Sequence, residues 1–277
     1  MFRYRQMDEI EVTADGAGQQ ARCLYGGEAL ARALTTLDPI GLDEMDAVAL
    51  MERRDTKYLF HRQTLIGALA ALAPHYRVLE VEGRRAQAYG TVYFDTSGFD
   101  LFAAHHRDQP SRYKVRRREY VESGLAFLEV KRRSRGRTSK ERIATDAPTG
   151  CLDSEGLTFL ESRISLSPGL LEAKVATEFS RITLVSRDRA ERLTLDYDLR
   201  FRAACGERRL SDVVIAEVKE GVHAGESPVK AFRRAANLHP VAISKYCTGA
   251  SLLYPSIKHN RFNPQLRRVI GFESSTP

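Results

Sequence analysis

The stretch RYKVRRREY, residues 112–120, carries more positive charge than a dry protein interior can hold. Side chains on a β-strand point alternately to the two faces of a sheet, so Lys114, Arg116 and Arg118 share one face and Arg117 lies on the other. One interpretation is a face open to water, because antiparallel sheets often have one solvated side. The neighbouring strands favour a different interpretation.

Two other predicted strands, FLEVKRR (127–133) and VVIAEVKEG (213–221), place charges among Val, Ile, Leu and Phe. Their apolar residues indicate cover on both faces, yet an unpaired charge in a dry interior costs too much free energy to persist. A closed barrel meets both demands, because its outer face packs against helices while its inner face lines a wet channel. We therefore predict an α+β fold: a closed antiparallel β-barrel with flanking helices, whose cationic lumen binds a linear polyanion such as a triphosphate.

The composition supports an anionic ligand and weakens several other functions. The chain has 43 Lys and Arg against 36 Asp and Glu, a net charge of +7, which favours an anionic partner. It has no Walker A loop, HExxH or GxSxG motif, so the reactions that depend on them lose support. The basic run at 131–137 lacks interleaved aromatic residues for base stacking, so we expect no nucleic-acid partner.

The chain shows no targeting or membrane signal. Its longest apolar run, residues 64–73, is too short to span a bilayer, and its first residues contain no apolar signal-peptide core. The four cysteines are scattered and form no CxxC pair, which suits a reducing compartment. We predict a cytoplasmic protein with no membrane segment in this chain. Its oligomeric state stays open.

The distribution of polar and periodic segments predicts one domain with polar ends. Residues 1–27 are rich in Gly, Gln and Asp, so we expect them to be disordered. Residues 28–255 form the domain, and residues 256–277 follow it as a C-terminal tail. Near the end of the domain, Ser227 and Pro228 occupy the N-cap and first position of a predicted helix.

Nine stretches, taken in order, resemble the VTC (vacuolar transporter chaperone) catalytic domain of the triphosphate tunnel metalloenzyme superfamily. They are ERRDTKYLF, TVYFDT, RYKVRRREY, FLEVKRR, GRTSKERI, FSRITL, ERLTLDYDLRF, IAEVKE and ISKYC. The resemblance implies an antiparallel barrel around a tunnel, and an enzyme that moves the γ-phosphate of ATP onto a growing polyphosphate chain. ATP and polyphosphate would be the partners. The cofactor would be Mn²⁺ or Mg²⁺, since hard oxygen ligands suit both ions.

The resemblance also implies roles for individual residues. The side chains expected to act on the transferred phosphate are Lys57, Lys114, Arg116, Lys131, Arg181 and Lys245. Further substrate contacts are expected from Arg118, Glu129, Lys140 and Ser244, and the metal ligand is expected to be Glu217. At position 114 the family often has arginine, so Lys114 keeps the charge but lacks a two-pronged guanidinium.

Two other functions stay open at this point. The first is a metal-dependent hydrolase of tripolyphosphate or nucleoside triphosphates, in which Glu129 would position the attacking water. The second is a non-catalytic module that binds polyanions. Glu129 and Glu217 could also serve only as structural partners of Lys131, Lys219 or nearby arginines. By strand alternation Glu129 and Lys131 share one face of their strand, Glu217 and Lys219 share one face of theirs, and Asp196 and Asp198 share the charged face of a further strand. Asp196 and Asp198 could join a metal site or pair with Arg192.

Overall fold

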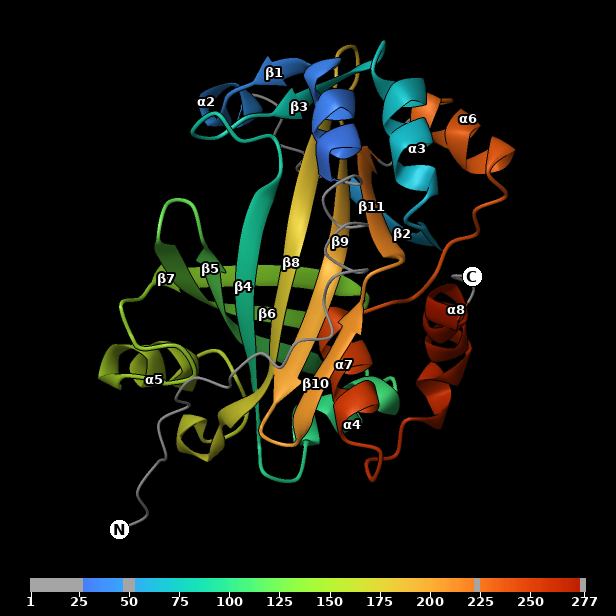
Figure 1. The fold of residues 1–277 in the computed structure, drawn as a ribbon. Coiled ribbons are helices and arrows are strands. Elements are labelled where there is room, and N and C mark those ends of the chain that lie inside the picture. Colours follow the sequence, from blue (N-terminus) through green and yellow to red (C-terminus); the bar gives the residue numbers. More distant parts are fainter. Residues whose placement is uncertain (1–26, 47–52, 222–224, 275–277) are drawn as a thin grey trace, which may run out of the picture.

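One strongly curled β-sheet organises the chain (Figure 1). The computed structural model describes residues 27–46, 53–221 and 225–274. The strands are β1 (Asp38–Ile40), β2 (Arg53–His61), β3 (Tyr76–Leu79), β4 (Gln87–Asp95), β5 (Arg112–Tyr120), β6 (Leu125–Ser134), β7 (Arg137–Ala144), β8 (Glu172–Ser186), β9 (Glu191–Ala203), β10 (Gly206–Leu210) and β11 (Val213–Gly221).

Helices surround this sheet on several sides. Helical residues 27–35 precede α2 (Leu42–Asp46), α3 (Thr64–Leu72), α4 (Asp100–His106), α5 (Ser154–Glu161), α6 (Pro228–Ala235), α7 (Lys245–Leu253) and α8 (Asn263–Ser274). Short 3₁₀ turns occupy Pro168–Leu170 and Asn260–Phe262. The predicted start of α6 is confirmed, with the Ser227 side chain accepting from the Lys230 amide and proline at the first helical position. In the described residues no helix is long and apolar enough to cross a membrane.

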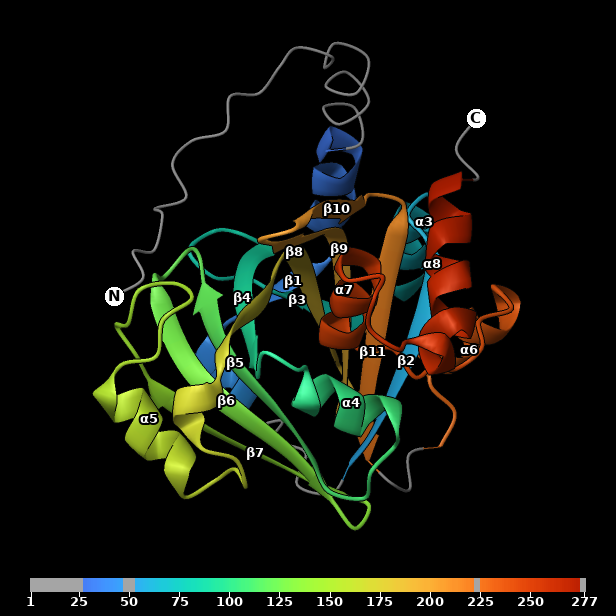
Figure 2. The ribbon, with the colours of Figure 1, turned by 90° about the horizontal axis from the view of Figure 1, so that it is seen from below.

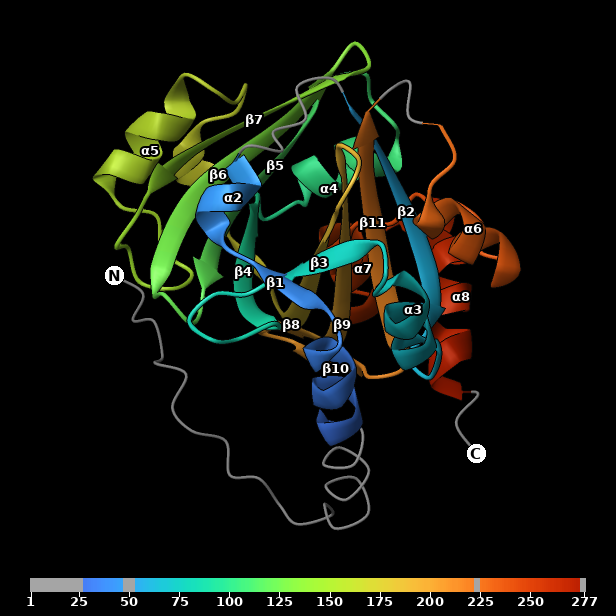
Figure 3. The same ribbon diagram turned by 90° about the horizontal axis from the view of Figure 1, so that it is seen from above.

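The main strand order is β2-β11-β9-β8-β4-β5-β6-β7, and every neighbouring pair in it is antiparallel. β10 pairs with β9, β3 pairs with β8, and β1 lies parallel to β3. Viewed from below and from above, the sheet bends into an open curve with β2 and β7 at its two ends (Figures 2 and 3). The predicted α+β class is therefore confirmed.

The expectation of a closed barrel is wrong. No strand among the described residues pairs with the outer edge of β2 or of β7, so the sheet is an open half-barrel. Every side chain of β7 except Ile143 is exposed. β7 carries Arg137, Lys140 and Arg142, and pairing it with β2 would set these cations against Arg54 and Lys57. Charged side chains on an edge strand oppose further pairing, and like charges directly opposite each other are unfavourable.

Separate apolar clusters cover the two faces of the sheet. On the convex face, α3 and α6 pack over β2, β9 and β11, while α5 covers β5 and β6. On the concave face, α7 packs within the curve against β8, β9 and β10, with α4 beside it (Figure 2). A Cβ on Gly249 of α7 would lie 2.5 Å from Phe201 Cδ1. Glycine therefore permits the close approach of α7 to the sheet.

The two ends of the chain differ in what the structure describes. Of the segment expected to be disordered, residues 1–26 lie outside the described residues. The segment expected to be a tail contains helix α8, in which Leu266 and Val269 are buried. α8 contacts β2, β10 and β11. Helix α8, with which the described chain ends, thus belongs to the packed structure.

The period-two pattern of the sheet is interrupted at a register shift between β4 and β8, and at a second one between β8 and β9. Asp196 points into the curve, as predicted, but Asp198 does not share its face. Asp198 has a φ of 52° where the β8–β9 register shifts, and its carboxylate pairs with Arg62. A bulge of this kind inserts one residue and reverses the alternation beyond it. The prediction that the two aspartates share a face is therefore wrong.

Candidate functional site

The β5–β6–β7 wall of the concave face carries two charged rows. Lys114, Lys131 and Lys140 are direct cross-strand partners in the first row. In the second row, Arg116 lies opposite Glu129. Arg116 Nε and Nη2 each lie 2.7 Å from Glu129 Oε2, and Lys140 pairs with the other oxygen, Oε1. Glu129 is thus held on both sides by cations.

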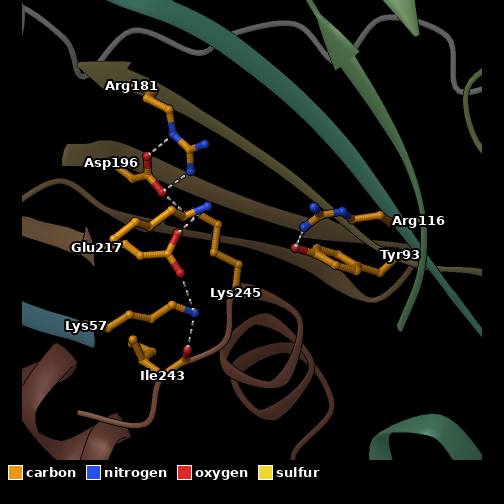
Figure 4. Close-up of polar contacts among 9 residues, drawn as sticks. Lys57, Tyr93, Arg116, Arg181, Asp196, Glu217, Ile243 and Lys245 are labelled. Carbon is orange, nitrogen blue, oxygen red and sulfur yellow. Dashed lines mark hydrogen bonds and ion pairs between the residues drawn. The ribbon is translucent and has the colours of Figure 1, made fainter. Parts of the chain in front are cut away.

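The opposite wall is built from β2 and β11. Lys57 and Glu217 are cross-strand partners, with 3.6 Å between Nζ and Oε1. Lys219 Nζ lies 3.7 Å from the second oxygen of Glu217. Lys57 also donates a 3.1 Å hydrogen bond to the carbonyl of Ile243, just before α7 (Figure 4). Neither ion pair of Glu217 is as short as a hydrogen bond, so this carboxylate keeps capacity for another partner.

A third cluster joins the middle of the sheet to α7. Arg181 on β8 donates to both oxygens of Asp196 on β9, at 2.5 and 2.8 Å. Lys245, the first residue of α7, reaches the same carboxylate from the other side (Figure 4). Its ammonium also lies 4.1 Å from the centre of the Phe179 ring. Asp196 therefore fixes two cations that come from distant parts of the sequence.

Burial and neighbouring charges shift the pKa of these groups. Burial opposes ionisation of Glu217, but Lys57 and Lys219 outweigh it and lower its pKa to about 2. In the same way Arg116, Arg118 and Lys140 overcome burial and lower the pKa of Glu129 to about 2. The carboxylates are therefore ionised and poor proton acceptors near neutral pH.

The pKa of three lysines of the site is also lowered, but in a lysine this shift disfavours the charged form. Loss of surrounding water is the main cause that lowers the pKa of Lys114, Lys140 and Lys245 to about 8 each, although the Lys140 side chain is itself still exposed. Nearby Lys57, Lys131 and Arg116 add to the effect at Lys114. Asp196 only partly offsets the burial of Lys245. A bound anion would favour the charged form of all three lysines.

Three cations of the site make no ion pair within the described part of the chain: Lys114, Lys131 and Arg118. Glu217 exerts only a longer-range pull on Lys131. Arg118 stacks over the Tyr89 ring at 5.6 Å, and its buried Nε has no hydrogen-bond partner among the described residues. Arg181 lies over the same ring at 5.0 Å. Two guanidinium groups therefore contact the same aromatic ring, and of the two only Arg181 is paired with a carboxylate.

The structure brings nearly all the residues predicted from sequence onto one surface. Ser244 has a structural role instead, because its side chain accepts a hydrogen bond from the Cys247 amide as the N-cap of α7. Arg117 lies on the other face, as predicted, and donates to the carbonyl of Ala147. Asp196 was left undecided in the sequence, and Tyr89 and Tyr93 were missed. Their period-two spacing on β4 was the available signal.

A divalent cation fits this site only together with an anionic substrate. Among the described residues no three His, Cys, Asp or Glu side chains gather closely enough to hold a metal ion. Glu217 is ionised, and its contacts with Lys57 and Lys219 are long, so it can offer one oxygen ligand. Mg²⁺-like ions are commonly held by one or two carboxylates plus substrate phosphates. The donor set agrees with that mode of binding.

Comparison with models of known protein families identifies the family of this chain. The model of the VTC domain family matches residues 52–152 and 158–254. These segments cover most of the chain and include every strand and helix that contributes to the site. The chain belongs to the VTC domain family. No curated protein sequence matches it significantly.

Solved structures resemble the chain more distantly. One is a candidate adenylyl cyclase from Hippeastrum described as having a dominant triphosphatase activity, with a TM-score of 0.48, 16% identity, and 73% of this chain and 96% of that chain covered. Another is a candidate adenylate cyclase from Bacillus halodurans, with a TM-score of 0.47, 14% identity, and 74% and 100% covered. A third, from Vibrio parahaemolyticus, has a TM-score of 0.41, 13% identity, and 72% and 97% covered. Likeness at this level does not transfer a function.

Proposed function

We propose that the concave face binds a linear phosphate chain and transfers the γ-phosphoryl group of ATP onto the end of that chain. The observation that carries the proposal is the row of Lys114, Lys131 and Lys140. Two of these three neighbouring lysines, Lys114 and Lys131, lack an ion pair in the described residues; Lys114 is partly buried, whereas Lys131 and Lys140 are exposed. Like charges on directly opposite strand positions repel one another unless an anion lies between them. A chain of phosphates supplies one negative charge after another along such a row.

The reaction needs positioning and charge neutralisation more than covalent chemistry. An anionic terminal oxygen of the acceptor chain forms a bond to the γ-phosphorus of ATP. The bond between that phosphorus and the oxygen bridging to the β-phosphate breaks, and ADP leaves with the electron pair. No proton needs to be removed from the acceptor. Arg116, Lys131 and Lys245 would neutralise the charge on the phosphoryl oxygens.

A divalent cation would contribute to the same neutralisation. Glu217 would hold Mn²⁺ or Mg²⁺ together with substrate oxygens, and the ion would offset charge on the phosphates. The protein's own part is to keep Glu217 ionised, and Lys57 and Lys219 do so by lowering its pKa to about 2. The proposed polymerase therefore depends on metal through a single protein carboxylate.

The carboxylates of the site favour transfer to phosphate over hydrolysis. A hydrolase needs a group that can orient or deprotonate water. Glu129 is nearly fully buried, both its oxygens are paired with cations, and its pKa is about 2. Asp196 is engaged by Arg181 and Lys245. Neither carboxylate is available as a base, whereas an anionic phosphate acceptor requires none.

The test is to incubate the pure protein with ATP and Mn²⁺ and to quantify ADP, polyphosphate chains and free phosphate separately. We expect one phosphate unit added to a chain for each ADP released. Free phosphate without chains would support the hydrolase instead, and tight tripolyphosphate binding without turnover would support the binding module. Lys131→Met should abolish chain formation, because it removes an unpaired cation without leaving a carboxylate unpaired. Lys258→Met, at an exposed lysine in the loop after α7, is the matched control.

A further inference from the structure

A buried carboxylate at the end of β4 ties together two helices that border the site. Asp95 is fully buried. Its Oδ1 accepts the amides of Thr96 and Leu101, and its Oδ2 accepts the amide of Phe102, each at 2.8 Å. These contacts hold the first turn of α4 against the sheet. The Tyr246 hydroxyl also donates to Oδ2 and so attaches α7 to the same group.

Tyr246 directly follows Lys245, so this hydrogen bond acts on the segment that carries a proposed phosphate-binding lysine. The segment is held at consecutive residues. Lys57 binds the carbonyl of Ile243, Ser244 caps α7, Lys245 reaches Asp196, and Tyr246 reaches Asp95. Of these contacts, the one to Asp95 is fully buried at both ends. It is therefore the contact least exchangeable for water.

The Tyr246 ring has a second connection, through Tyr93 to the β5–β6–β7 wall of the site. It stacks on Tyr93, with 5.1 Å between ring centres and an angle of 27°. The Tyr93 hydroxyl lies 3.5 Å from Arg116 Nη1 (Figure 4). The Phe102 ring packs perpendicular to the Tyr246 ring, with 6.2 Å between ring centres. The ring of Tyr246 is thus held by contacts with two other aromatic rings.

We propose that Asp95 and Tyr246 are positioning residues, which set the register and direction of the first turn of α7 and thereby place Lys245 beside Asp196. This inference rests on the proposed function, because its readout is the binding of a phosphate chain. Without the hydroxyl–carboxylate contact, α7 would still be covered by its apolar neighbours. Its N-terminal turn could then shift, and long-range contacts such as Lys245–Asp196 would loosen.

The test is a double-mutant cycle read by calorimetric binding of tripolyphosphate. Tyr246→Phe keeps the ring and removes only the hydroxyl. We expect it to weaken tripolyphosphate binding by about tenfold in the wild-type background, because the coupling energy between residues in contact is commonly of this size. In the Lys245→Met background the same substitution should have almost no further effect on affinity, while it still lowers the melting temperature. Asp95→Asn should reproduce the affinity loss.

A matched control separates positioning from general destabilisation. Tyr76 is also buried and also donates to a buried carboxylate, that of Glu191, but it lies in the cluster on the convex face. Tyr76→Phe should lower the melting temperature without changing tripolyphosphate affinity. Equal affinity losses from Tyr246→Phe with and without Lys245, or an equal loss from Tyr76→Phe, would overturn the inference. Failure of the proposed function would be seen separately, as absence of tripolyphosphate binding by the wild-type protein.

Discussion

Arg116 and Arg117 are consecutive in the chain, yet their guanidinium groups lie on opposite faces of the sheet. Arg116 pairs with Glu129 in the concave site, and Arg117 pairs with Glu119 and binds the carbonyl of Ala147 on the other side. Both residues are partly buried and both have a carboxylate partner. They form a natural pair of variants in which charge, size and sequence position are matched but the predicted role is not.

Arg116→Ala should weaken tripolyphosphate binding by roughly tenfold to a hundredfold, because charge-assisted contacts contribute roughly 1.5–3 kcal/mol each. Arg117→Ala should leave the affinity nearly unchanged. Calorimetry at fixed salt measures both. Equal losses would indicate diffuse attraction to a basic surface, and the assignment of the concave face as the binding surface would fail.

Glu217→Gln should separate metal binding from phosphate binding. Without metal, the variant should bind tripolyphosphate at least as tightly as wild type, since an anion has been removed from the site. Adding Mn²⁺ should strengthen binding by the wild type but not by the variant. Glu220→Gln is the control, because Glu220 is on the same strand but pairs with Lys230 on the other face. A metal response that survives Glu217→Gln would exclude Glu217 as the ligand.

Lys114 should take up protons when phosphate binds. Its pKa in the free protein is about 8, chiefly because it is buried, and an adjacent phosphate would raise it again. The complex then holds more protons than the free protein near pH 8, so affinity should fall as pH rises from about 7 to about 9. Calorimetry in buffers of different ionisation enthalpy measures the uptake. The uptake should be smaller in Lys114→Met, and an unchanged value would show that Lys114 does not titrate on binding.

Gly249→Ala should disturb the seat of α7. The new Cβ would lie 2.5 Å from Phe201 Cδ1 and 2.9 Å from Val175 Cγ1, so either the helix or the sheet must move. We expect a loss of roughly 1–3 kcal/mol in the free energy of unfolding, typical of overpacking. Gly67→Ala in α3 is the control, because nothing lies within 4 Å of its added Cβ. It should stabilise the protein by roughly 0.5–1 kcal/mol, and urea titrations compare the two. A Gly249→Ala protein as stable as wild type would contradict the tight contact.

Much of the site could be predicted from the sequence because strand periodicity is a local property. The alternation in RYKVRRREY placed Arg116 and Arg117 on opposite faces before any strand partner was known. The same alternation put Glu129 and Lys131 on one face of their strand and Glu217 and Lys219 on one face of theirs. Local spacing also gave the Ser227 cap and the proline at the start of α6.

Other features depended on residues far apart in the chain. Asp198 left the predicted face because the β8–β9 register shifts at a bulge, and an alternating pattern does not reveal an inserted residue. The same pattern is compatible with an open or a closed sheet, so the sequence could not show that β7 and β2 remain unpaired.

The sequence by itself determined which face the strand residues outside the bulges occupy and how much positive charge that face carries. Only the tertiary structure decided which charges are neutralised. Asp196 meets Lys245 across 49 positions of sequence, and Tyr246 meets Asp95 across 151. Lys114 and Lys131 meet each other, and no carboxylate among the described residues pairs with them. The physical reason is that side-chain direction follows from the local backbone, whereas the partner of a charge is set by how distant strands and helices pack together.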